Sequence, residues 1–286
     1  MRILIHTVVT ILAAAPLFTL GCTTLQLNNA RVQTETTLAK VLVSDEDEEA
    51  LGRQVQAELE SQGTRYVKDA QVVSYVEGLV NRIAPVAQKD RQTTFKVHVV
   101  DDPKTVNAFA TPGGHVYVFT GLLLAADDEA QVVGVLAHEI GHVTARHTAR
   151  QLVGLYGVQV VNEMALGKDP STLAKVAAAI AGNGALLAHS RASENEADAY
   201  AVRYASTLGY DPTGISRFFQ HLMANEGQVP RVLTWLSTHP ANADRIAHVK
   251  ELISTEGLRG TEVGADRLLP VKQRLGGTRV SARESP

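Results

Sequence analysis

The sequence predicts an α+β domain that is predominantly helical, with a small β-sheet or hairpin beside one apolar helix. Three observations lead to this class. Apolar residues recur at helical spacing in several segments between residues 45 and 258. Alternation of apolar and polar residues, which is typical of strands, is confined to residues 95–120. Alanine is abundant and aromatic residues make up only 5% of the chain, which favours helices.

Residues 1–21 have the composition of a secretory signal peptide. An apolar run follows Arg2 and ends just before Cys22, the only cysteine of the chain. The final six residues of this segment, Leu-Phe-Thr-Leu-Gly-Cys, resemble a lipobox, so we expect a lipoprotein signal peptide and lipidation at Cys22. Thr19 stands where leucine is usual in that motif. The alternatives are an ordinary signal peptide or an uncleaved anchor helix.

The segment after the cysteine is expected to be a lipidated N-terminus and flexible tether over residues 22–44, because it is polar and rich in threonine and glutamine. Thr23 after Cys22 favours the outer membrane over the inner one, by analogy with bacterial lipoproteins. This predicts a periplasm-facing lipoprotein of the cell envelope that is held to the membrane by its N-terminal lipid. The net charge of −3 gives no indication of nucleic-acid binding.

Two helices are predicted next. Ser44 and Asp47 have the spacing of a capping box and open a helix that runs to about Gln62. A second helix over residues 69–84 carries apolar side chains at helical spacing.

Strands follow these helices. Residues 95–100 alternate, and His98 falls on the polar face, where we expect a surface residue. Residues 106–120 predict a hairpin whose turn is Gly113-Gly114.

The remaining elements are mostly helical. Residues 152–188 are rich in glycine, alanine and valine, which is consistent with either plain core or a mobile lid. Beyond residue 258 the chain turns polar, so residues 259–286 are expected to be a disordered tail. Helices are predicted over 127–151, over 185–208 with Gly209 as its C-terminal cap, over 213–225 and over 241–253.

Residues 138–142 read H-E-x-x-H on the predicted helix over 127–151. His138 and His142 are four apart, so they lie on one helical face and can bind one zinc ion. Glu139 is then placed as a general base. The alternative is an amphipathic helix with histidines at its wet edge. The motif is surrounded by apolar residues, however, and buried histidines are costly without partners.

The third ligand of a catalytic zinc ion must come from a separate element. Glu194 and Asp198 are four apart on the predicted helix over 185–208 and share one face. We expect Glu194 to bind the metal and Asp198 to accept a hydrogen bond from the far nitrogen of a zinc-bound histidine. Glu196 lies half a turn away and is expected to be solvated. A plain charged helix face is the alternative.

Four motifs in order resemble the HtpX-like zinc metallopeptidases, which are relatives of the CAAX prenyl endopeptidases in peptidase family M48. The resemblance covers about residues 45–255 and is closest to single-domain, lipid-anchored bacterial members such as LoiP. The integral membrane helices of HtpX and the helical-repeat domain of BepA have no counterpart here. The motifs are residues 107–123, from Asn-Ala-Phe-Ala to Gly-Leu-Leu; 136–142, Leu-Ala-His-Glu-Ile-Gly-His; 190–198, Ser-Arg-Ala-Ser-Glu-Asn-Glu-Ala-Asp; and 237–240, Ser-Thr-His-Pro, with Arg245.

The resemblance implies a gluzincin-type metalloprotease domain over residues 45–258 that holds one Zn²⁺ per chain. The implied ligands are His138, His142 and Glu194, with Glu139 as the catalytic base.

The resemblance also implies that His239 lies near the metal. There it either stabilises the oxyanion or fills the open zinc position in a resting state. Arg245 is expected to pair with an acid near the site. His147 is five residues past the motif and is not expected to be a ligand. His189, His221 and His248 have no supporting pattern.

These features predict a zinc-dependent metalloendopeptidase that cleaves unfolded or misassembled envelope proteins, including outer-membrane proteins. The strand that holds His115, Val116 and Tyr117 is expected to bind the substrate as an added strand. One alternative is a periplasmic chaperone or assembly factor with latent or no proteolysis. Another is a zinc hydrolase that acts on non-peptide amides.

Overall fold

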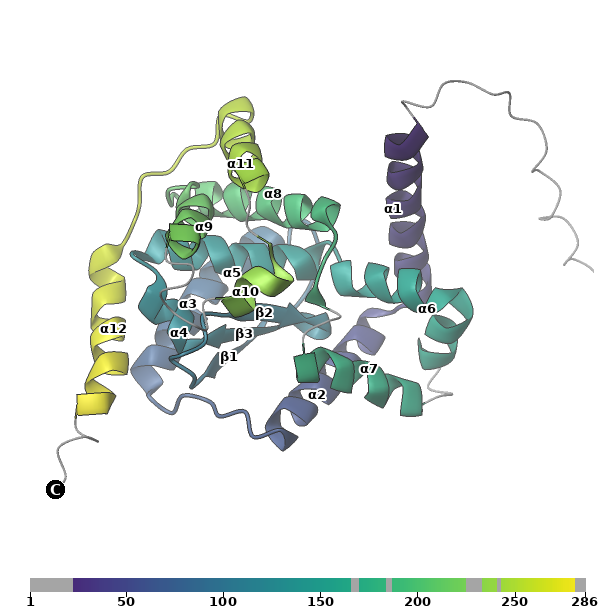
Figure 1. Ribbon diagram of the computed structural model, residues 1–286, viewed down its shortest axis with the longest axis horizontal. Coiled ribbons are helices and arrows are strands. Elements are labelled where there is room, and N and C mark those ends of the chain that lie inside the picture. The colour runs from purple at the N-terminus through teal and green to yellow at the C-terminus, as the bar shows by residue number, and fades with distance from the viewer. Residues whose placement is uncertain (1–22, 166–169, 184–186, 225–232, 241–242, 281–286) are drawn as a thin grey trace, which may run out of the picture.

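The computed structural model of the chain describes residues 23–165, 170–183, 187–224, 233–240 and 243–280. Within these ranges, helices surround a three-stranded mixed sheet (Figure 1), so the predicted α+β class is confirmed. The elements are α1 (Thr23–Leu42), α2 (Asp45–Ser61), α3 (Ala70–Ala87), β1 (Lys96–Val100), β2 (Ala108–Thr111), the 3-10 helix η1 (Pro112–Gly114), β3 (His115–Phe119), α4 (Thr120–Ala125), α5 (Glu129–Thr144), α6 (His147–Ala165), α7 (Pro170–Asn183), α8 (Arg191–Thr207), α9 (Gly214–Ala224), α10 (Leu233–Thr238), α11 (Ala243–Thr255) and α12 (Ala265–Val280).

The sheet has the order β1-β3-β2, with β1 parallel and β2 antiparallel to β3. The predicted hairpin is confirmed, and its turn is η1, where Gly113 and Gly114 have φ values of 77° and 79°. A side chain at Gly114 would also meet the carbonyl oxygen of Thr94 at 2.2 Å. Glycine is therefore required at this turn by both backbone angle and space.

The two faces of the sheet pack against different helices. Val116 and Val118 of β3 point into the main core with α3 and α5, whereas Tyr117 belongs to a second core with α2, α6 and α7. His98 stacks between His115 and Tyr117, with ring centroids 5.2 and 4.6 Å away. The expectation that His98 is a surface residue was wrong, because the second face of the sheet is also covered.

Helix α5 lies between the sheet and α8 (Figure 1), and every one of its residues is buried. Its two glycines, Gly134 and Gly141, lie where neighbouring helices come closest. A Cβ atom at Gly134 would lie 2.6 Å from the backbone nitrogen of Ile215, and one at Gly141 would lie 2.8 Å from Cβ of Tyr200. Helices α8 and α9 therefore approach α5 close to its backbone.

Helix α5 ends at Thr144, whereas the sequence predicted one helix over 127–151. Arg146 has a φ of 57°, in the left-handed region that L residues rarely adopt, and this breaks the helix before α6 begins at His147. The side chain of Arg146 donates to Glu48 Oε1 at 3.0 Å and to the carbonyl oxygen of Val43 at 2.5 Å. These contacts hold the turn in place.

The tether expected over residues 22–44 is helical from Thr23 to Leu42. This helix, α1, packs against α6, and Ala39 is buried in the second core. The expectation of a flexible tether was wrong because apolar positions on α1 find a partner in α6. Cys22 and the predicted signal peptide over 1–21 lie outside the described residues. None of the helices in the described ranges is long and apolar enough to cross a membrane.

The expected disordered tail contains helix α12, so this expectation was also wrong. Leu268 and Val271 are buried in the main core. Arg274 donates to Asp69 Oδ2 at 2.8 Å, at the N-terminal cap of α3. Although the segment is polar overall, its few apolar residues, including Leu268 and Val271, lie on one side of α12 and pack against the domain.

The described parts of residues 152–188 form α6 and α7. Val161, Val176 and Ile180 are buried in the second core beside α2. This packing supports the core interpretation of the segment over the lid.

Candidate metal centre

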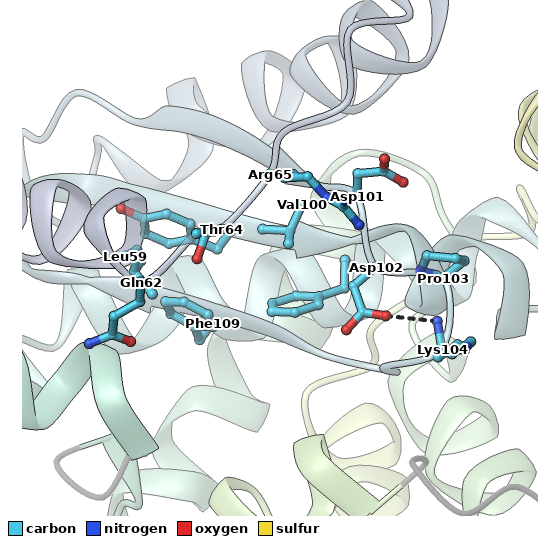
Figure 2. A pocket seen from close by; sticks show the side chains of 13 residues that line it. Leu59, Gln62, Thr64, Arg65, Val100, Asp101, Asp102, Pro103, Lys104 and Phe109 are labelled. Atoms are coloured by element: carbon cyan, nitrogen blue, oxygen red, sulfur yellow. Dashed lines mark hydrogen bonds between the residues drawn. The ribbon is translucent and has the colours of Figure 1, made fainter.

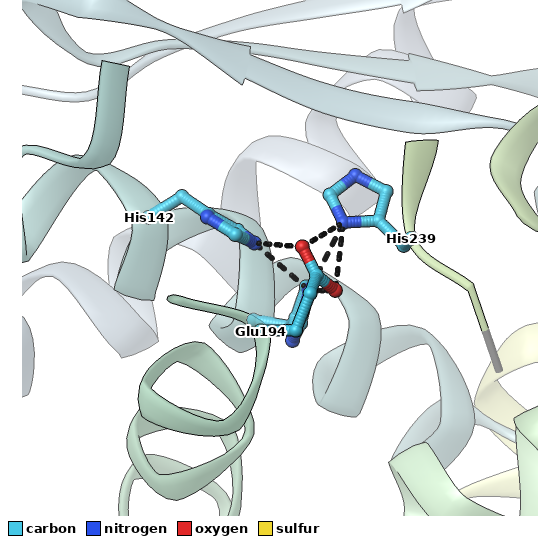
Figure 3. A group of neighbouring side chains, drawn as sticks. His142, Glu194 and His239 are labelled. Atoms are coloured by element: carbon cyan, nitrogen blue, oxygen red, sulfur yellow. Dashed lines mark hydrogen bonds and ion pairs between the residues drawn. The ribbon is translucent and has the colours of Figure 1, made fainter. Parts of the chain in front are cut away.

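Four buried side chains from three parts of the chain converge in the interior of the domain. His138 and His142 come from α5, Glu194 from the first turn of α8, and His239 from the residue after α10. One ligand atom from each lies within 4.8 Å of the others, and all four side chains are buried. Figure 3 shows His142, Glu194 and His239 pointing at one another. The three ligands predicted from the sequence are thus brought together with His239.

The spacing of the atoms defines the centre of the cluster. Nε2 of His138 and Nε2 of His142 are 3.0 Å apart. The Glu194 carboxylate faces both, with Oε2 at 3.5 Å from His138 and Oε1 at 3.4 Å from His142. Nδ1 of His239 lies 3.1 Å from Glu194 Oε1 and 3.3 Å from His138 Nε2. Three nitrogens and a carboxylate therefore face one point, which is a donor set typical of zinc.

The far side of His138 has the partner expected from the sequence. Nδ1 of His138 lies 3.0 Å from Asp198 Oδ1. Asp198 is completely buried and lies one turn after Glu194 on α8. Arg245 donates to both oxygens of Asp198, at 2.8 and 2.7 Å, and its Nη1 lies 2.9 Å from Glu194 Oε2. The acid that Arg245 was expected to pair with is therefore Asp198, together with Glu194.

The charge balance of the cluster favours a bound cation. Burial alone would raise the pKa of Glu194, but His239 and His138 hold it well below its usual range, so this carboxylate stays ionised. Burial alone would lower the pKa of His138, but hydrogen bonds to Asp198 and Glu194 outweigh it and raise the pKa to about 9. Three carboxylates, Glu139, Glu194 and Asp198, are buried here, and Arg245 pairs with two of them. Without a metal, the proton held by His138 supplies the remaining positive charge, and a bound cation would take its place. The donor set and the charge both fit a divalent metal ion.

Glu139 points into the same pocket and is buried. Its Oε1 accepts a hydrogen bond from Nε1 of Trp235 at 3.2 Å and lies 3.5 Å from Nε2 of His239. Trp235 stacks on His239 with ring centroids 5.1 Å apart. The sequence reasoning missed Trp235 and α10. The available signal was the position of the only tryptophan, four residues before His239.

A third histidine of the α5–α6 region is also part of this cluster. His147 lies against His142, with 2.8 Å between the two Nδ1 atoms. Glu196 is 40% exposed, so it is partly solvated as expected, but it also accepts from His147 and from Arg150 at 3.1 and 2.8 Å. His189, which precedes α8, stacks on His142 with ring centroids 4.1 Å apart. Spacing along a continuous helix could not reveal these contacts.

The expected substrate strand is not available for pairing. His115, Val116 and Tyr117 lie on β3, which is the central strand and is hydrogen-bonded to β1 on one side and β2 on the other. The expectation was wrong because β3 has no free edge. Strand β2 is the edge strand of the sheet that packs next to α5.

A larger hollow lies elsewhere, on the sheet face that carries Tyr117. This cavity of about 630 Å³ has an apolar floor that includes Val100 and Phe109, and a charged rim that includes Asp102 and Lys104 (Figure 2). None of the metal-centre residues lines it. This cavity is therefore separate from the group of residues that could bind a metal.

The sequence was compared with known proteins. A sequence model of peptidase family M48 matches residues 68–253, more than half of the chain. This chain belongs to peptidase family M48. The family expected from the four motifs is therefore confirmed, and all four converging side chains of the M48 chain fall within the matched region.

Curated relatives of this M48 chain include proteases from bacteria and mitochondria. The mitochondrial metalloendopeptidase OMA1 of Schizosaccharomyces pombe is 33% identical over 177 residues, which are 62% of this chain and 52% of that protein. The putative beta-barrel assembly-enhancing protease of Vibrio cholerae is 30% identical over 204 residues, 65% of this chain and 40% of that protein. The metalloprotease YcaL of Escherichia coli is 27% identical over 222 residues, 74% of this chain and 82% of that protein. The M48 chain thus spans about half, or less, of the first two relatives.

Proposed function

We propose that this chain is a zinc-dependent metalloendopeptidase that cleaves unfolded or misassembled proteins of the cell envelope. The observation that carries the proposal is the buried convergence of His138, His142 and Glu194 with Glu139 at its side. Family membership supports a metal-dependent peptidase, and the nitrogen-rich donor set supports zinc as the metal.

Glu139 is the residue proposed to move the proton. A bound zinc ion supplies a Lewis acid and lowers the pKa of water to about 7. Glu139 takes the proton from the attacking water and then passes it to the leaving amine of the scissile peptide. The indole of Trp235 holds one oxygen of this carboxylate at 3.2 Å, which fixes the orientation of the base.

His239 is proposed to close the site at rest. Catalytic zinc sites keep one position open, whereas Nδ1 of His239 stands with the other three ligand atoms. A substrate carbonyl would need that position at a bound metal, so His239 would have to withdraw first. Stabilisation of the oxyanion by His239 is the alternative role that the family resemblance implies.

The proposed substrate is an extended segment of polypeptide. Strand β2 (Ala108–Thr111) is a sheet edge that packs beside α5, and an extended chain can pair with such an edge through backbone hydrogen bonds. This arrangement favours unfolded polypeptide over compact amides of other kinds. Unfolded outer-membrane proteins are the proposed class, in keeping with the name of the Vibrio cholerae relative, a putative beta-barrel assembly-enhancing protease.

The proposed location is the periplasmic side of the envelope, with a lipid at Cys22 as the membrane attachment. The lipobox-like sequence supports lipidation, and Thr23 after the cysteine supports the outer membrane. The membrane and the polypeptide substrate are the proposed partners.

Digestion of casein and of an unfolded outer-membrane protein tests the activity. The full chain should cleave both, a chelator should stop cleavage, and added Zn²⁺ should restore it. Glu139→Gln should keep zinc and lose a factor of about 10² to 10⁴ in rate. Undiminished cleavage by Glu139→Gln would sink the mechanism. Zinc-loaded wild type that prevents aggregation of the unfolded protein without cutting it would favour the chaperone alternative.

A further inference from the structure

A second series of contacts ends on the ligand His142, separate from the Asp198–Arg245 pair behind His138. Nε2 of His142 faces His138 and Glu194, so this nitrogen is the one directed at the proposed metal. The other nitrogen, Nδ1, lies 2.8 Å from Nδ1 of His147. The rings meet edge to face, with an interplanar angle of 70°. His147 thus occupies the place behind His142 that Asp198 occupies behind His138.

The proton positions along this series follow from the partners. A neutral imidazole that offers Nε2 to a metal carries its proton on Nδ1, so His142 donates to Nδ1 of His147. His147 then carries its own proton on Nε2, which lies 3.1 Å from Glu196 Oε2. Glu196 is an acceptor and also receives Nη1 of Arg150 at 2.8 Å. Each donor in the series meets an acceptor, and this leaves Nε2 of His142 free for the metal.

The backbone is specially shaped to bring His147 to this place. On a continuous helix, residues 142 and 147 would point in different directions, because five residues correspond to about 1.4 turns. The left-handed turn at Arg146, with φ 57°, ends α5 and folds His147 back against His142. Glu48 holds the Arg146 side chain at 3.0 Å, and His147 is 98% shielded from solvent. An unfavourable backbone conformation is thus kept where it positions a buried histidine.

We infer that His147 is a positioning residue for the metal ligand His142, and that Glu196 and Arg150 hold His147 in the tautomer that accepts the His142 proton. The inference rests on the proposed zinc site. The two histidine ligands then have independent supports of different chemistry. His138 is supported by the carboxylate of Asp198, which Arg245 holds in place. His142 is supported by the neutral imidazole of His147, which Glu196 and Arg150 hold in place. Helix α8 supplies both carboxylates together with the ligand Glu194.

Zinc affinity, measured by competition with a chromophoric chelator at fixed pH, tests the role of His147. His147→Phe keeps an aromatic ring but removes the acceptor, and it should weaken zinc binding about 10- to 100-fold. His147→Asn removes the ring but keeps an oxygen at the position of Nδ1, and it should bind zinc within a few-fold of wild type. If His147 only fills space, the order of these two variants is reversed. His248→Phe, on α11, is the matched control and should leave zinc affinity unchanged.

A second variant guards against a folding defect in His147→Phe. The Glu196 side chain is 40% exposed, so Glu196→Ala should fold, as checked by far-ultraviolet circular dichroism, and should lose about tenfold in zinc affinity. Wild-type zinc affinity in Glu196→Ala and in any folded His147→Phe would overturn the inference. A wild-type chain that binds no zinc would instead overturn the proposed function, so the two failures are distinguishable.

Discussion

Arg245 holds Asp198 through two parallel hydrogen bonds, from Nε to Oδ2 at 2.8 Å and from Nη2 to Oδ1 at 2.7 Å. The third nitrogen of the same guanidinium reaches Glu194. A single cation on α11 therefore fixes both the acid that orients His138 and the acid that is the proposed ligand. The planar guanidinium of arginine can donate to two carboxylates at once in this geometry, whereas the compact ammonium group of lysine cannot.

Replacement of Arg245 should damage both metal binding and stability. Arg245→Met leaves Asp198 and Glu194 buried without their cation, which costs about 3–5 kcal/mol in the free energy of unfolding. It should also weaken zinc binding about 10- to 100-fold. Chemical denaturation and chelator competition measure the two effects. Arg203→Met is the control, since Arg203 makes an exposed pair with Glu256 and should cost under about 1 kcal/mol. Equal losses in the two variants would contradict the assignment.

Removal of the His239 imidazole should open the site. His239→Ala should bind zinc more weakly, because one of four converging ligand atoms is lost. At saturating zinc it should cleave casein faster, roughly tenfold if the closed state is favoured by about 1.4 kcal/mol. Initial rates at several zinc concentrations separate the two effects. A rate below that of wild type at saturating zinc would indicate that oxyanion stabilisation by His239 outweighs its closing role.

The histidine pair on the second sheet face should make stability depend on pH. Burial and the neighbouring His98 and Lys96 lower the pKa of His115 to about 4, against 6.5 for an ordinary histidine. The unfolded chain therefore binds more protons between these values, and stability is lost as the pH falls through this window. In the presence of chelator, the free energy of unfolding of wild type should exceed that of His115→Asn at pH 7. This difference should shrink by an amount on the order of 1–2 kcal/mol between pH 7 and 5. An advantage that stays constant across this window would show that His115 is not buried in its neutral form.

Helices α5 and α9 are so close at Gly134 that adding a single methyl group there should destabilise the protein. Gly134→Ala places Cβ 2.6 Å from a backbone nitrogen that cannot move aside independently, so we expect a loss of about 1–3 kcal/mol. Gly78→Ala is the matched control, because Gly78 lies on the exposed side of α3 and nothing lies within 4 Å of its Cβ. That variant should gain about 0.5–1 kcal/mol from helix propensity. Thermal or urea unfolding of the metal-free protein measures the stability of both variants. If both gain or both lose stability by a similar amount, α9 does not approach α5 as closely as described.

Residue spacing was sufficient to predict the centre of the site. His138 and His142 share a face because a helix repeats every 3.6 residues, and the same rule pairs Glu194 with Asp198. The side chains with no periodic relation to the motif were not predictable in this way. His147 depends on a left-handed residue at Arg146, and nothing in the local sequence marks a non-glycine residue for that conformation.

The fold was predictable where packing follows a simple period, and less so where partners are distant. The capping box at Ser44 and the Gly113-Gly114 turn were predicted from local chemistry and are confirmed. The order of the strands was not, because the parallel pairing of β1 with β3 is a long-range choice that leaves no local trace. Helices α1 and α12 were mistaken for unstructured segments, since their apolar positions are few and are stabilised only by distant elements.

Trp235 is the only tryptophan of the chain, and its indole contacts both Glu139, the proposed base, and His239, the residue proposed to close the site. All tryptophan emission of the protein therefore originates within the active centre, from a ring stacked on His239 and hydrogen-bonded to Glu139. If His239 withdraws as proposed, the indole loses this stacking partner and its emission changes. The protein therefore carries its own optical probe, and the proposed withdrawal of His239 can be followed by tryptophan fluorescence in the unlabelled chain.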